Sequence, residues 1–120
     1  MASLEKYSAP GVFEPATYSQ AIKVTGAQTI LFLAGQVAYD KDGGVLHPGN
    51  FKGQAREAGG GRMESIVKIT TYLTDVRYRP DLVPIREEFF GKKGPASTLI
   101  QVSSLSHPDY LIEIEAIAVV

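Results

Sequence analysis

The chain has 120 residues, of which 44% are hydrophobic and 21% are charged. This length supports one domain with a real core, covering residues 1–120, and leaves no room for two. The 12 basic and 13 acidic side chains give a net charge of −1, which argues against nucleic acid as a partner. The absence of Cys excludes disulfides and cysteine-ligated zinc. No stretch approaches the ~18 apolar residues of a membrane span, so a cytoplasmic protein is expected.

The first third of the chain is predicted to form one β-hairpin. Residues 1–18 are expected to be irregular. The segments 19–25 (SQAIKVT) and 29–34 (TILFLA) predict two short strands joined by a tight connection. Gly35-Gln36 ends the second strand and favours a bulge or a close backbone approach. The sequence DKDGG at 40–44 predicts a turn.

The middle of the chain predicts a short helix and then a strand. Residues 52–58 (KGQAREA) begin like a helix, but three glycines follow at 59–61. Each glycine costs about 1 kcal/mol relative to Ala inside a helix, so one or two turns are expected before them. Residues 65–74 (SIVKITTYLT) are rich in β-branched and aromatic side chains, which predicts a strand.

A second helix is predicted after the connection at 75–79. Asp81 is expected to cap it, with Pro84 tolerated in its first turn. The expected faces are an apolar stripe of Leu82, Ile85 and Phe89 and a polar face of Arg86, Glu87 and Glu88, up to a stop at Gly91. A strand before this helix and another after it predict a βαβ crossover in an α/β or α+β domain.

The last quarter of the chain predicts two strands, at 97–102 and 111–120, joined by a turn at 106–109. The final strand alternates with period two, which places Ile112, Ile114, Ala116, Ala118 and Val120 on one face and Glu113, Glu115, Ile117 and Val119 on the other. Two neighbouring carboxylates on such an apolar strand allow two interpretations. The strand end dips into solvent, or one Glu faces a cleft and does acid–base work.

Other motifs favour no site of their own. His47 and His107 lie beside prolines without further ligands at suitable spacing, so no metal site is expected. The serines near His107 lack a Gly-x-Ser-x-Gly elbow, which argues against a hydrolase triad. The glycines at 59–61 precede Arg-Met and a predicted strand, unlike a phosphate-binding loop.

Five segments together resemble the YjgF-like, or Rid (reactive intermediate deaminase), family. They are LAGQV at 33–37, IVKITTYLTD at 66–75, EFFG at 88–91, PASTLIQV at 95–102 and LIEIEAIAV at 111–119. Their order and spacing match over most of the chain, which is identified as a member. The resemblance implies an α+β, chorismate-mutase-like fold: a six-stranded mixed sheet with two helices on one face. It also implies a homotrimer with ligand clefts between subunits, and no metal or cofactor.

The resemblance also implies an activity and a set of residues. Active members hydrolyse enamine or imine products of pyridoxal-phosphate enzymes to keto acids and ammonia, and a Glu on the last strand is thought to position the water. That Glu corresponds to Glu113, and the family's N-terminal Tyr to Tyr18. The other expected positions around a small-molecule ligand are Ala34, Gly35, Val83, Ser97, Thr98 and Leu99.

Ser97 stands where the family has an Arg that binds the substrate carboxylate. A hydroxyl cannot replace a bidentate guanidinium clamp. The expected function is therefore hydrolysis or deamination of a small imine, enamine or related C–N substrate other than 2-aminoacrylate. The alternative is a non-catalytic trimer that binds a small metabolite. The family's older description as an endoribonuclease or translation inhibitor is least favoured, given the near-neutral charge.

The segment between Arg56 and Ile66 is shorter than the family pattern by roughly ten residues, or about three helical turns. Either the first helix is truncated and one side of the sheet is poorly covered, or residues are missing from the chain. Missing residues are favoured, because each large apolar side chain left wet forfeits about 1.5–3 kcal/mol.

Overall fold

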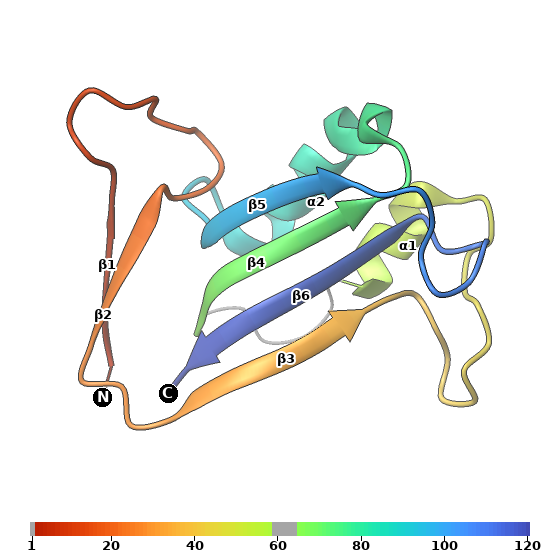
Figure 1. Ribbon diagram of the computed structural model, residues 1–120, viewed down its shortest axis with the longest axis horizontal. Coiled ribbons are helices and arrows are strands. Elements are labelled where there is room, and N and C mark those ends of the chain that lie inside the picture. The colour runs from red at the N-terminus through yellow and green to blue at the C-terminus, as the bar shows by residue number, and fades with distance from the viewer. Residues whose placement is uncertain (1, 59–64) are drawn as a thin grey trace.

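The computed structural model describes residues 2–58 and 65–120 and places two helices against one face of a mixed sheet (Figure 1). The strands of this sheet are β3 (Ile30–Gln36), β4 (Ile66–Leu73), β5 (Ala96–Gln101) and β6 (Ile112–Val119), in the order β3-β6-β4-β5. The helices are α1 (Phe51–Ala58) and α2 (Arg79–Phe90). The predicted α+β class is confirmed.

The predicted βαβ crossover is confirmed as well. Strands β4 and β5 are parallel, and the chain passes between them through a 3₁₀ turn (Val76–Tyr78) and α2. β6 runs antiparallel to both β3 and β4, so it is central in the sheet. The two strands predicted in the last quarter of the chain are therefore not neighbours, because β4 lies between them.

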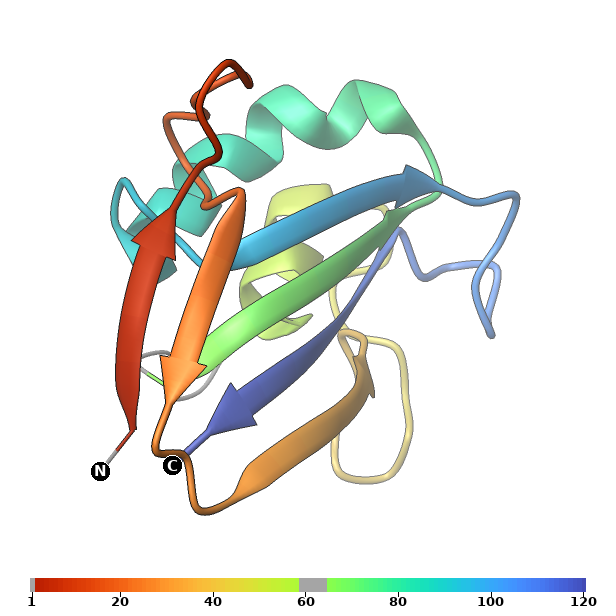
Figure 2. The same ribbon diagram turned by 60° about the vertical axis from the view of Figure 1, so that its left-hand side comes forward.

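The N-terminal prediction was wrong in two respects. Ser3–Tyr7 forms a strand, β1, where an irregular segment was expected, and it pairs antiparallel with β2 (Ala21–Thr25). β2 and β3 are not a hairpin, because β3 pairs with β6 and the amides of Gln28 and Thr29 donate to the Val120 carbonyl. The six described strands thus form a two-stranded and a four-stranded sheet, set at an angle in Figure 2.

The local predictions around β3 are confirmed. The register of β3 against β6 shifts between Leu33 and Gln36, which is the irregularity expected at Gly35-Gln36. In the turn at 40–44, the Asp40 N–H donates to the Gly44 carbonyl at 2.9 Å, and the Asp40 carboxylate accepts from the Gly44 N–H at 2.8 Å.

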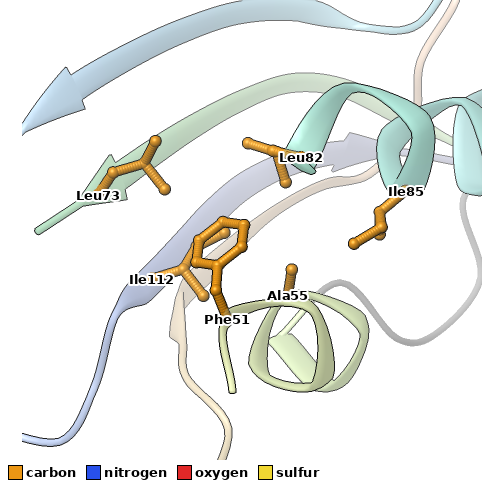
Figure 3. Packing of buried hydrophobic residues seen from close by; sticks show 6 residues of the cluster. All are labelled: Phe51, Ala55, Leu73, Leu82, Ile85 and Ile112. Carbon is orange, nitrogen blue, oxygen red and sulfur yellow. The ribbon is translucent and has the colours of Figure 1, made fainter. Parts of the chain in front are cut away.

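The core lies between the helices and the sheet (Figure 3). It consists of Phe51 and Ala55 from α1, Leu82 and Ile85 from α2, Leu73 from β4 and Ile112 from β6. The ring of Phe51 stacks on that of Tyr78, with centroids 4.4 Å apart. The fully buried Gln54 donates to the Asp109 carbonyl and accepts from the Leu111 amide, both at 2.8 Å, and so fixes α1 to the start of β6.

Helix α2 differs from its prediction at its start. It begins at Arg79 with Pro80 near its first position, so Asp81 lies in the first turn and is not the cap. Pro84 therefore lies inside the helix, where it has no N–H to donate to the Pro80 carbonyl. Gly91, at φ 70°, ends the helix as predicted.

Helix α1 covers only part of its side of the sheet. It is described as far as Ala58, so the predicted stop at residues 59–61 lies outside the described residues. Leu31 and Leu33 of β3 share the helix-bearing face with Ala118 and Ala116 of β6, yet they are 45% and 42% exposed. This exposure agrees with both explanations of the short segment, a truncated first helix or residues missing from the chain, and the second stays the favoured prediction.

Candidate functional site

The carboxylates of β6 lie on the face of the four-stranded sheet that carries no helix, here called the bare face. Ile112 belongs to the core under the helices, so Glu113 and Glu115 point the other way. Their partners on β4 are Tyr72 and Thr70. The predicted alternation of the last strand is confirmed.

Glu115 is held by a neighbour. The Tyr72 hydroxyl donates to Glu115 Oε1 at 2.7 Å. This hydrogen bond favours the neutral phenol and raises the pKa of Tyr72, with burial and the carboxylate charges of Glu115 and Glu113 acting in the same direction. A carboxylate engaged in this way has less freedom to position a reacting water.

Glu113 lies against Gly35 at the irregular end of β3. A Cβ added to Gly35 would come within 2.0 Å of Glu113 Oε2, so this approach requires glycine. Among the described residues Glu113 has no ion pair and accepts no side-chain hydrogen bond. The half-buried carboxylate is therefore available to a ligand or a water molecule.

The predicted ligand positions on β5 lie on different faces of the sheet. Thr98 accepts a 2.7 Å hydrogen bond from Lys68 Nζ on the bare face. Ser97 and Leu99 point to the opposite face, where Leu99 packs against the core and Ser97 is paired with the buried Ile69. Ala34 lines a cavity on that same helix-bearing face.

Tyr18 and Val83 also belong to the helix side. Burial lowers the pKa of Arg86 of α2 and the charge of Tyr18 raises it, so Tyr18 lies near that helix. Val83 lies on α2 and is half-buried. Within one copy, Glu113 and Gly35 thus lie together, whereas Tyr18, Val83 and Ser97 lie across the sheet from the Glu113 carboxylate.

Arg86 is a residue that the sequence analysis placed wrongly. It was assigned to the polar face of α2, but it is only 8% exposed, and its Nη2 donates to Thr71 Oγ1 of β4 at 3.2 Å. Burial lowers the pKa of the Arg86 guanidinium, Arg79 lowers it further, and Tyr18 raises it. Its spacing of four residues from Leu82 was the signal, because residues four apart share a helix face.

His47 contacts a glutamate and His107 contacts a tyrosine. His47 Nε2 lies 3.4 Å from Glu57 Oε1, and the ring of His107 packs edge-on to Tyr110. In the described part of the chain, no three His, Asp or Glu side chains gather as metal ligands would. None of the described helices is both long and apolar enough to cross a membrane.

Comparisons with known proteins match this geometry to one family. The family model described as endoribonuclease L-PSP matches residues 12–120. A RutC family protein from Pyrococcus horikoshii is 39% identical over 111 residues, which cover 84% of this chain and 85% of that protein. Since 84% of the 120 residues is about 101 residues, the 111 aligned positions include about ten gaps in this chain. This agrees with the short segment noted between Arg56 and Ile66.

Solved structures agree on the fold. A Rid-family protein of unknown function from Yersinia pestis, YyfB, superposes with a TM-score of 0.85 over 98% of both chains, at 22% identity. A second one, YyfA, has a TM-score of 0.65 at 29% identity and covers 98% of this chain and 100% of its own. The predicted Rid/YjgF-like resemblance is confirmed.

Proposed function

The chain belongs to the endoribonuclease L-PSP family, and from that premise we propose that it hydrolyses a C–N bond of a small imine or enamine in a cleft between subunits. Water adds to the imine carbon, the C–N bond breaks, and ammonia leaves while the carbon becomes a carbonyl. Glu113 positions the water and carries its proton. A cytoplasmic location stays a prediction.

The observation that carries this proposal is the contrast between the two carboxylates on β6. Glu115 is engaged by the Tyr72 hydroxyl, whereas Glu113 lies free against the Gly35 backbone among the described residues. A general acid–base group needs an unoccupied oxygen within reach of its proton. Of the two, only Glu113 meets that requirement.

We further propose that the working unit is a homotrimer. Ile30, Phe32 and Ile100 occupy the bare face and are 56%, 78% and 43% exposed. Apolar patches of this kind on a sheet mark association surfaces. A second copy packed near this face would bring its own Tyr18, Val83 and Ser97 toward Glu113, and so assemble the expected positions that one copy keeps apart.

Ammonia release tests the reaction. Iminium products of alanine, leucine and a neutral amine, generated enzymatically in the assay, are supplied to wild type, Glu113→Gln and Glu115→Gln. Wild type is expected to release ammonia from at least one of them. Glu113→Gln is expected to lose about a hundredfold or more of the rate, and Glu115→Gln only a few-fold. Equal losses in the two variants would contradict the assigned role of Glu113.

The second candidate function is a non-catalytic trimer that binds a small metabolite, and Ser97 is the observation that favours it. Without a guanidinium at position 97, the chain lacks the carboxylate clamp that the family resemblance implies. Activity that is absent from wild type but appears in Ser97→Arg would favour the binder. Inactivity of both proteins would also favour it. The endoribonuclease activity in the family's name would instead require RNA cleavage that is lost in Glu113→Gln.

A further inference from the structure

The bare face of the sheet carries a hollow with a volume of about 260 Å³. A water molecule occupies about 30 Å³, so the hollow has the space of about nine waters and suits a small ligand with about that many non-hydrogen atoms. Its side chains come from three strands, with Phe32 from β3, Glu115 and Ile117 from β6, and Lys68 and Thr70 from β4.

The apolar and the charged side chains take different parts of this hollow. The register places Phe32 and Lys68 on either side of Ile117. The Phe32 ring, which is 78% exposed, therefore forms the apolar end. Lys68 and Glu115 lie diagonally across the neighbouring strands β4 and β6, and none of the ion pairs between described residues joins them. A small molecule in the hollow would meet a cation and an anion at the same time.

Both charged groups are held by a neighbour and keep capacity for a ligand. The Lys68 ammonium donates to Thr98 Oγ1 at 2.7 Å, which leaves its other N–H groups. The Tyr72 hydroxyl donates to Glu115 Oε1, which leaves Oε2 as an acceptor. Side chains that are already fixed lose less conformational entropy when a ligand binds.

We propose that this hollow binds an apolar α-amino acid, with its carboxylate on Lys68, its ammonium group on Glu115 and its side chain against Phe32. A zwitterion satisfies both charges at once, and hydrogen bonds between charged groups are the stronger ones. The volume suits a side chain of the size of leucine. This binding site uses Glu115 and leaves Glu113 aside, so it does not depend on the proposed reaction.

The site is compatible with the proposed trimer. Ile30 and Ile100 lie on β3 and β5, the two edge strands of the bare face. A second copy resting on them would close over the hollow, because β6 and β4, which carry Ile117 and Lys68, lie between those edges. The ligand would then lie between copies, so binding is measured on the protein in its native oligomeric state.

Amide NMR titrations of the full chain test the proposal with a matched series of ligands. Leucine is compared with 4-methylpentanoate, which lacks the ammonium group, with 3-methylbutylamine, which lacks the carboxylate, and with glycine, which lacks the apolar chain. Leucine is expected to bind at millimolar concentration and about tenfold more tightly than each of the three, with shifted amides in β3, β4 and β6. The proposal is overturned if leucine does not bind, or if either single-charge analogue binds as tightly.

Two variants assign the ends of the ligand. Lys68→Met is expected to bind leucine no better than 3-methylbutylamine, and Glu115→Gln no better than 4-methylpentanoate, because each lacks one of the two charges. The controls Lys52→Met and Glu87→Gln remove exposed charges from the helices across the sheet and should change leucine binding less than about twofold. Unchanged leucine binding in Lys68→Met or Glu115→Gln would overturn the proposal. The ligand series in wild type decides the matter if a variant does not fold.

Discussion

The two faces of the four-stranded sheet differ in what covers their side chains. On the helix-bearing face, Ile112 and Thr71 are fully buried, and Arg86 reaches down from α2. On the bare face, Phe32 is 78% exposed, and the polar groups pair along the surface, as Tyr72 does with Glu115. Neighbouring residues of one strand therefore serve different purposes. One set stabilises the fold of the single chain, and the other set would face a ligand and a second copy in the proposed trimer.

The largest expected difference between the faces is in the stability lost when an isoleucine of β6 is replaced by alanine. Ile112→Ala removes a fully buried side chain and is expected to cost about 2–5 kcal/mol in the free energy of unfolding. Ile117→Ala, on the bare face, is expected to cost less, and its cost should shrink on dilution because the proposed trimer would bury this side chain between copies. Denaturant unfolding at several protein concentrations measures both. A concentration-independent loss in Ile117→Ala as large as that in Ile112→Ala would contradict the comparison.

Two adjacent threonines of β4 sharpen the comparison. Thr71→Val leaves the Arg86 guanidinium without its described acceptor and is expected to cost about 1–3 kcal/mol in the free energy of unfolding. Thr70→Val, on the bare face, is the matched control and is expected to change stability by less than about 0.5 kcal/mol.

Arg86→Met completes the test of the buried cation. Replacing a buried charge with an apolar side chain is often neutral or stabilising, so this variant should unfold no earlier than wild type. The double variant Thr71→Val with Arg86→Met should recover most of the stability that Thr71→Val loses. A double variant no more stable than Thr71→Val alone would mean that Arg86 is not the reason for the loss.

The smallest expected effect is the contribution of Tyr72 to the pH dependence of the free energy of unfolding. Its pKa is raised above the ordinary 10.0 in the folded protein, so between pH 10 and the folded pKa the native state keeps a proton that the unfolded state has lost. The contribution to stability is complete below pH 10 and is lost as pH rises through the folded pKa. Unfolding measured from pH 8 to 12 should show a steeper decline in wild type than in Tyr72→Phe. Parallel curves would contradict the Tyr72–Glu115 hydrogen bond.

Local patterns in the sequence predicted the elements of the larger sheet well. The period-two alternation of β6 placed Glu113 and Ile112 on opposite faces, because the side-chain direction in a strand depends only on the position in the chain. Pairing between distant segments could not be predicted in the same way. SLEKY at Ser3–Tyr7 carries little apolar signal, and it becomes a strand because β2 is aligned beside it.

The candidate site was predicted only in part. The family resemblance pointed to Glu113, and its close approach to Gly35 gives that residue a physical reason for its place. The family resemblance could not show that Ser97 and Glu113 lie on opposite faces of the sheet, because their placement depends on the register of β4 with both β5 and β6. Arg86 was missed because a charged residue beside two glutamates was taken for a solvated face, although Leu82 lies four residues before it.

The central claim is that one site takes Glu113 from one copy and the face carrying Ser97 from another, and subunit mixing tests it most directly. Glu113→Gln and Ser97→Trp, each expected to be inactive, are unfolded together and refolded as mixed trimers. One interface in four then joins an intact Glu113 to an intact Ser97 face, so ammonia release should return to about a quarter of the wild-type rate. A mixture no more active than its two separate parents would contradict a shared site.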